Sequence, residues 1–329
     1  MTENVSKPTK LIRYAKYKEI QQELMLCYEE TRITGEPHCA AIEAPTGGGK
    51  TTLMKDTLLR LNIKPDKYLI IDTPDNPTPK SVISAGLERI GDVGFNKIRY
   101  LWEGKARLKR FVIEKGILLI IWDDFQHFLS GRYMSIEEAS EYLKTFIKDT
   151  GATCFVTGLE GDIEAILDSN NQLSRLFEIR ESIGVFSWQW GLSSIEDIQA
   201  CQQFFAALEK SLALEFMDVT QIPKGSATVQ QSNMHRQELI YRIIYAMQGV
   251  TANIVNLVRR AAREASMEDE PKIGLRHLSK AFSVRIEKHV KDRYNPFNLP
   301  IDTHFTLGLK PINQTDDDNR NLGDILSTT

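Results

Sequence analysis

The stretch that most constrains the fold is Cys39–Thr52, CAAIEAPTGGGKTT, where a short apolar run ends in three glycines followed by a lysine and two threonines. Backbone N–H groups of such a loop point into one concavity, where the next helix presents the positive end of its dipole. This order of strand, glycine-rich turn and helix is typical of a loop that binds nucleotide phosphates. A glycine-rich hairpin turn would explain the glycines but not the Lys-Thr-Thr helix start.

The loop predicts a site residue by residue. We expect Lys50 to reach the β- and γ-phosphates of the nucleotide and the Thr51 hydroxyl to bind Mg²⁺. The loop departs from the pattern GxxxxGK[ST] because Ala44 stands at the first glycine, which is compatible only if that position does not need positive φ. The predicted nucleotide-binding set is Pro45, Thr46, Gly47, Gly48, Gly49, Lys50, Thr51 and Thr52.

Composition fits a nucleotide-binding domain with a substantial appendage. The chain has 329 residues, of which 42% are hydrophobic and 26% charged, as in ordinary soluble proteins. Its net charge of −3 requires any nucleic-acid surface to be a local basic patch. No apolar run is long enough to span a membrane, and no signal-peptide pattern opens the chain, so we expect a cytoplasmic protein without membrane contact. The cysteine and histidine spacings predict neither a disulfide nor a structural metal.

Apolar runs alternate with helical periodicity along the first part of the chain. This alternation predicts an α/β fold with a five-stranded parallel sheet. After the first strand, which precedes the phosphate loop, the expected strands are Lys67–Asp72, Ile117–Asp124, Ala152–Thr157 and Gly184–Trp190. From Ser194 onward only helical patterns follow. We therefore predict an N-terminal arm and helix (1–36), a nucleotide-binding core (37–192), a small all-helical lid (193–294) and a polar C-terminal tail (295–329).

The strand Ile117–Asp124, ILLIIWDD, ends in two acids and resembles a Walker B motif. Carboxylates at the carboxyl end of a buried strand lie where α/β sheets bind ligands. Asp123 is expected to hold the Mg²⁺ shell, and Asp124 to orient or deprotonate the attacking water, a role that glutamate usually fills. Thr157, at the end of the next strand, occupies the place of a γ-phosphate sensor, although a threonine at a strand end is commonly structural.

The segment Asn96–Lys115 is helical and unusually basic. A solvated helix face and a patch that follows a phosphate backbone explain this charge about equally well. The DNA-binding reading is favoured slightly because the rest of the chain is acidic. The candidate contacts are Lys97, Arg99, Lys105, Arg107 and Lys109.

Missing motifs narrow the class of NTPase. The chain has no NKxD motif for guanine and no LSGGQ signature of transporters, so ATP is favoured over GTP and a transporter is disfavoured. A small-molecule kinase stays possible. A long helical region after the core, together with Arg175 after the fourth strand, favours an oligomeric ATPase.

The residues from about 37 to 297 resemble the TniB/TnsC transposition ATPases of the AAA+ superfamily, which include those of CRISPR-associated transposons. Beyond the Walker motifs, the similar segments are DDFQHF at 123–128, like that family's DE-x-HH-[LF], and QLSRLF at 172–177, like its QL-x-x-RF. The ending Asn295-Pro296-Phe297 is also similar. Departures are Ala44, Asp124, Gln126 in place of a histidine, and Asn253 near the usual sensor arginine of the lid.

The resemblance implies an ATPase with ATP and Mg²⁺ as cofactors that hydrolyses slowly and in step with assembly. It implies a homo-oligomer, a ring or helical filament, on double-stranded DNA, which receives a target-selection signal from another protein and recruits the transposase. On the matching positions, Thr157 would be sensor one and Arg175 the arginine finger. Two other classes stay open: a helicase-loader or initiator-like ATPase, and a nucleotide-gated signalling scaffold that does not bind DNA.

Overall fold

The computed structural model describes residues 11–72, 74, 78–129, 135–187, 194–212, 215–216, 239–268, 272–285 and 295–298. The chain forms two compact units. One is Tyr17–Gly184, and the other combines Met1–Lys16 with Val185–Thr329. Each unit is described by itself below.

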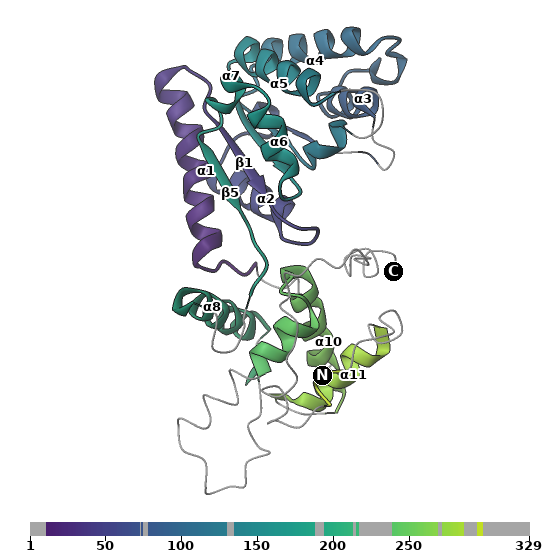
Figure 1. Ribbon diagram of the computed structural model, residues 1–329. Coiled ribbons are helices and arrows are strands. Elements are labelled where there is room, and N and C mark those ends of the chain that lie inside the picture. The colour runs from purple at the N-terminus through teal and green to yellow at the C-terminus, as the bar shows by residue number, and fades with distance from the viewer. Residues whose placement is uncertain are drawn as a thin grey trace, which may run out of the picture. The chain divides into compact units, whose positions relative to one another are not determined.

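A five-stranded sheet organises the first unit (Figure 1). Its order is β2-β3-β4-β1-β5, and every neighbouring pair is parallel, which confirms the predicted sheet. The carboxyl ends of β1, β3 and β4 therefore meet at one edge, where the candidate site residues lie. The strands are β1 (Cys39–Glu43), β2 (Tyr68–Ile71), β3 (Leu119–Trp122), β4 (Thr153–Gly158) and β5 (Ile179–Ser182).

The position of the fifth strand differs from the prediction. β5 is Ile179–Ser182, whereas the sequence pattern suggested Gly184–Trp190. The reason is that β5 pairs only with β1 and none of its residues is buried, so its sequence IRES has no apolar signature. Residues 183–187 are irregular, and 188–190 lie outside the described residues.

Helices cover both faces of the sheet. Alternate strand residues such as Ile120, Trp122 and Val156 join one hydrophobic core with the helices α3 to α7. The buried side chains of α1 and α2 are absent from that core and pack on the other face. The helices of this unit are α1 (Ala15–Thr34), α2 (Lys50–Leu61), α3 (Pro79–Arg89), α4 (Leu101–Lys115), α5 (Ile136–Thr150), α6 (Asp162–Asp168) and α7 (Asn171–Ser174).

A buried polar cluster fastens α1 to the helix that follows the phosphate loop. Asp56 of α2 is 4% exposed and accepts hydrogen bonds from Gln21 Nε2 (2.7 Å) and Tyr17 Oη (3.3 Å). A buried carboxylate is costly unless it is paired in this way. We infer that α1 is an integral part of the nucleotide-binding unit.

The second unit is mainly helical. It contains α8 (Ile195–Leu212), a helical stretch over 239–246, α10 (Thr251–Met267) and α11 (Leu275–Arg285). The prediction of an all-helical lid is wrong in one respect, because β6 (Glu215–Phe216) and β7 (Lys272–Ile273) form a short parallel pair. Two-residue strands are too short to leave a period-two pattern in the sequence. Within the part of the chain that the structure describes, no helix has the length and apolar character needed to cross a bilayer.

Residues 295–298, predicted to begin the polar tail, instead pack on helices of this second unit. Phe297 is 4% exposed, and its ring lies edge-on to that of Phe282 with centroids 6.0 Å apart. Arg242 Nη1 donates to the carbonyl of Pro296 at 2.7 Å. The buried aromatic anchor explains why this short motif belongs to the helical unit. The rest of the predicted tail lies outside the described residues.

Candidate nucleotide site

The phosphate loop connects β1 to α2 with a backbone that only its glycines allow. Gly47 (φ 77°) and Gly49 (φ 103°) lie in the left-handed region. A Cβ at Gly48 would stand 2.7 Å from Cβ of Ala44. Ala44 itself is fully buried and is not among the positive-φ residues of the described chain. The condition set for alanine at the first glycine position is therefore met.

Lys50, the first residue of α2, points its ammonium group toward the carboxyl ends of β1 and β3. Its Nζ donates to the carbonyl of Ala44 at 2.8 Å and lies 3.6 Å from Oδ1 of Asp124. The side chain is only 8% exposed. A buried point charge at this place suits an anionic ligand.

Asp123 lies between two threonine hydroxyls that come from different elements. Thr51 Oγ1 donates to Asp123 Oδ2 at 2.7 Å, and Thr157 Oγ1 donates to Asp123 Oδ1 at 2.5 Å. The Thr157 hydroxyl also accepts a hydrogen bond from the backbone N–H of Asp124 at 3.1 Å. Thr157 is fully buried, and these hydrogen bonds link β4 to the two acids. Its role as a phosphate sensor stays a prediction.

The residues that meet here fit a magnesium site. Thr51 and Asp123 offer a hydroxyl and a carboxylate oxygen within 2.7 Å of each other, and Mg²⁺ prefers hard oxygen ligands of this kind. When bound with a nucleotide, Mg²⁺ neutralises charge on the β- and γ-phosphate oxygens.

Asp124 has an unusual backbone for a residue with a side chain. Its φ is 55°, and only Asn62 and Gln248 share such a conformation among the described residues other than glycine. Gln126 Nε2 donates to Asp124 Oδ1 at 3.4 Å. In the sequence Gln126 is only a departure from a family motif, and nothing in the pattern predicts its contact with the acid.

Glu43, the last residue of β1, was also missed. Its carboxylate accepts hydrogen bonds from the backbone N–H groups of Gly161, Ile163 and Glu164 at 3.0–3.1 Å. These groups open α6, so an acid directly before the phosphate loop holds the segment that follows β4. In the sequence, the position of this carboxylate two residues before the loop proline is the only signal for the role of Glu43.

Two arginines follow β4, and the structure separates their roles. Arg180 donates to Asp168 Oδ1 (2.7 Å) and to Ser174 Oγ (2.6 Å), so contacts within the unit account for its position. Arg175 follows α7 directly and is exposed. Within the described residues its side chain has no hydrogen bond or ion pair. Arg175 is thus the more exposed of the two arginines, and its role as an arginine finger stays a prediction.

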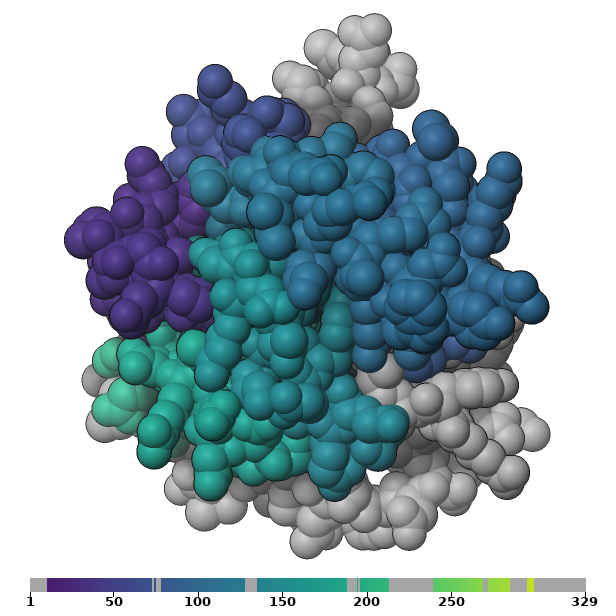
Figure 2. Space-filling view, turned by 90° about the horizontal axis from the view of Figure 1, so that it is seen from above, coloured from purple at the N-terminus to yellow at the C-terminus, as the bar shows by residue number. Residues whose placement is uncertain are grey.

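The basic helix does not present one free positive face. Arg107 forms a close ion pair with the buried Asp92, and Lys109 Nζ lies 2.8 Å from Asp149 on α5. Figure 2 looks onto the end of the unit where α4 and α5 are packed together. These pairs give two of the candidate DNA contacts a structural explanation.

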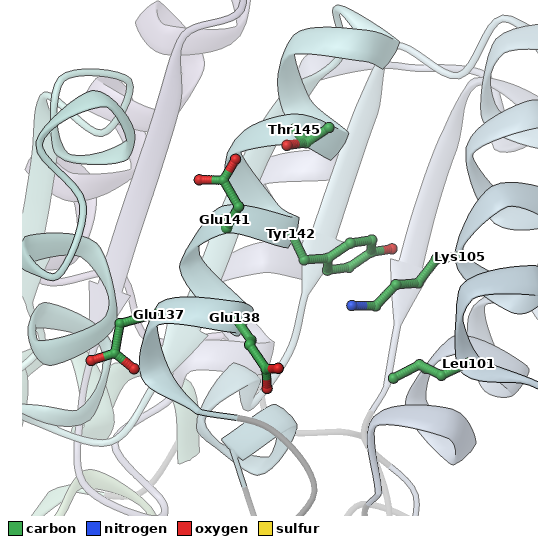
Figure 3. A pocket seen from close by; sticks show the side chains of 7 residues that line it. All are labelled: Leu101, Lys105, Glu137, Glu138, Glu141, Tyr142 and Thr145. Carbon is green, nitrogen blue, oxygen red and sulfur yellow. The ribbon is translucent and has the colours of Figure 1, made fainter.

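Lys105 is held in an open groove of about 590 Å³ between α4 and α5. Its Nζ lies 4.1 Å from the centre of the Tyr142 ring, and Figure 3 shows it reaching across from α4. Burial lowers the pKa of Lys105 because desolvation disfavours the ammonium form, while nearby Glu138 acts in the opposite direction. Lys97 and Arg99, before α4, are exposed and form no ion pair with another described residue, so the DNA-binding hypothesis rests on them.

Comparison with known proteins identifies the fold. Residues 33–167 match a family model described as AAA domain. Among solved structures, the ORC1 protein of Aeropyrum pernix in complex with DNA is 15% identical, with a TM-score of 0.59 and coverage of 88% of this chain and 69% of that one. The ORC2 protein of Aeropyrum pernix is 13% identical (TM-score 0.58; 88% and 72% covered). Cdc6p from Pyrobaculum aerophilum is 12% identical (TM-score 0.57; 86% and 71% covered). The search of curated proteins found no match.

The fold and the site define a P-loop NTPase with the AAA+ fold. Residues 33–167 match the AAA domain model, and the fold is similar to that of the ORC and Cdc6 proteins. The resemblance to TniB/TnsC proteins stays a prediction.

Proposed function

We propose that this chain is an ATP-hydrolysing, DNA-binding AAA+ protein that assembles on duplex DNA and regulates transposition, linking target-site selection to transposase recruitment. The observation that carries the ATPase part is the meeting of Lys50, Thr51 and the two acids at one edge of the sheet. The exposed, unpaired Arg175 supports assembly, because a guanidinium there can serve the nucleotide of an adjacent subunit.

Each residue takes a distinct part in the proposed reaction. Lys50 neutralises charge on the transferred phosphate, while Thr51 and Asp123 hold Mg²⁺. Asp124 orients the attacking water and accepts its proton. Arg175 of an adjacent subunit adds charge to the transition state. Hydrolysis would then depend on assembly.

The proposal that the protein regulates transposition rests on two segments, 123–128 and 172–177, which resemble motifs of the TniB/TnsC family. An initiator or helicase-loader role is the second candidate, favoured by the similarity in fold to ORC and Cdc6 proteins. A gel shift with duplex DNA, run with ATP and with a non-hydrolysable analogue, tests the shared part of both candidates. Recruitment of a transposase by the DNA-bound protein would separate them in favour of transposition.

Replacing Asp124 by asparagine should slow hydrolysis while leaving nucleotide binding intact. Asparagine adopts positive φ as readily as aspartate, so the backbone is preserved and only the charge is lost. We expect kcat to fall about a hundredfold, within the usual range for a general base. Steady-state ATPase assays with duplex DNA, alongside the exposed control Asp66→Asn, measure this. An unchanged kcat would assign the role to another residue.

DNA binding should be salt-dependent and should depend on Lys97 and Arg99. Reversing both charges (Lys97→Glu with Arg99→Glu) should weaken binding and lower the log–log salt slope by about 2, because each removes one phosphate contact. The control Lys55→Glu with Lys64→Glu makes the same charge change at two exposed lysines on other elements. Anisotropy titrations of a labelled duplex at several salt concentrations measure both slopes. If both double variants lost DNA affinity equally, the loss would follow from the net charge of the protein and not from contacts of Lys97 and Arg99.

A further inference from the structure

Asp124 stands where the Walker B motif usually has glutamate, and the backbone conformation at this position explains the shorter residue. Asp124 has φ 55°, a conformation that aspartate and asparagine enter more easily than longer residues. Its N–H donates to the Thr157 hydroxyl, which ties this backbone to β4. Aspartate, however, reaches one methylene less far than glutamate. Its carboxylate can orient a water only if neighbouring groups hold it in one place.

Two side chains hold the same oxygen of Asp124. Oδ1 lies 3.6 Å from Lys50 Nζ and accepts a hydrogen bond from Gln126 Nε2 at 3.4 Å. In the proposed reaction Lys50 serves the phosphates, so its contact with Asp124 is shared with the substrate. Gln126 has no role toward the phosphates in that reaction, so it can keep the Asp124 carboxylate oriented while ATP is bound and hydrolysed.

The amide of Gln126 is placed at a cost. Its Oε1 is buried and has no hydrogen-bond partner among the described residues. The amide lies against Gly158, where a Cβ would come within 2.8 Å of that oxygen and within 2.4 Å of Ile163. An apolar side chain of similar size would fill this place without leaving a buried acceptor unpaired. The Nε2 end, which reaches Asp124, therefore accounts for an amide at this position.

We propose that Gln126 is a positioning residue that orients the Asp124 carboxylate for attack of water on ATP. The inference rests on the proposed function, since it assumes that Asp124 activates the water. It adds a residue on η3 (Phe125–Leu129), the turn that follows β3, to the machinery that the phosphate loop and the two acids form.

The test is a double-mutant cycle in the full-length protein with duplex DNA. Gln126→Leu is made both in the wild type and in Asp124→Asn, and Gln22→Leu, on the exposed face of α1, is the matched control. We expect Gln126→Leu to lower kcat at least about tenfold in the wild type but less than about twofold in Asp124→Asn, since it acts through the carboxylate. The KM for ATP and the affinity for a non-hydrolysable analogue should stay unchanged. The Tm should stay the same or rise, because the unpaired acceptor is gone.

Other outcomes overturn the inference. An equal fall of kcat in both backgrounds would show that Gln126 acts independently of Asp124. A lower Tm together with weaker analogue binding would make Gln126 a structural residue. A wild type that bound ATP without hydrolysing it would remove the proposed function and this inference together, whereas normal wild-type hydrolysis with an unaffected Gln126→Leu variant would remove the inference alone.

Discussion

Replacing Lys50 by alanine is expected to abolish ATP binding and every activity that depends on it. The Nζ group is buried between the Ala44 carbonyl and the Asp124 carboxylate, and alanine puts no charge in its place. Loss of a buried charge that faces phosphate costs about 2–5 kcal/mol, or about 30-fold to a few thousandfold in Kd. Titration with a fluorescent ATP analogue measures this directly.

The matched control for this prediction is Lys55→Ala, which removes an exposed lysine from the same helix. It should bind the analogue like the wild type. If Lys50→Ala also bound the analogue with wild-type affinity, the assignment of the phosphate site to this loop would be wrong.

Replacing Arg175 by alanine should leave ATP binding by the monomer intact but eliminate hydrolysis. The physical reason is that one subunit already supplies Lys50, whereas a planar guanidinium from a neighbour stabilises the charge of the transition state. Where such arginine fingers are measured, they raise the rate about 10³- to 10⁵-fold. The exposure of Arg175 and the internal hydrogen bonds of Arg180 both favour Arg175 as that group. The variant should also assemble poorly on DNA.

Mixing two inactive variants tests action between subunits. In a mixture of Arg175→Ala with Lys50→Ala, an intact phosphate loop on one subunit can meet an intact Arg175 on the next. We expect partial recovery of ATPase activity in the mixture and none in either variant alone. Arg110→Ala, at an exposed arginine of α4, is the control and should keep wild-type activity. Full activity of Arg175→Ala by itself would contradict the assignment.

The sequence predicted the central fold well because its signals are local. Uninterrupted apolar strands such as Leu119–Trp122 and the glycine-rich loop before α2 carry strong patterns, and the five-stranded sheet is confirmed. The edge strand Ile179–Ser182 was misplaced because it is polar. The pairing of β6 with β7 was missed because each contributes only two residues.

The contacts of the site depend on residues that are distant in sequence, which patterns along one chain do not reveal. The sequence predicts Lys109 as a DNA contact, whereas in the structure it pairs with Asp149, which lies 40 residues away in the chain. Thr51 and Asp123 meet across 72 residues. The sequence shows Gln126 only as a departure from a motif. Its contact with Asp124, a residue with positive φ, is visible only in the structure.

Electron microscopy of the protein with duplex DNA, with and without a non-hydrolysable ATP analogue, tests the proposed function most directly. In that proposal, nucleotide occupancy and assembly on DNA share one subunit interface. We expect rings or helical filaments on DNA when the analogue is present, and their loss when the analogue is omitted or when Lys50→Ala is used. Assemblies that form equally well without nucleotide, or particles that stay monomeric under every condition, would contradict it.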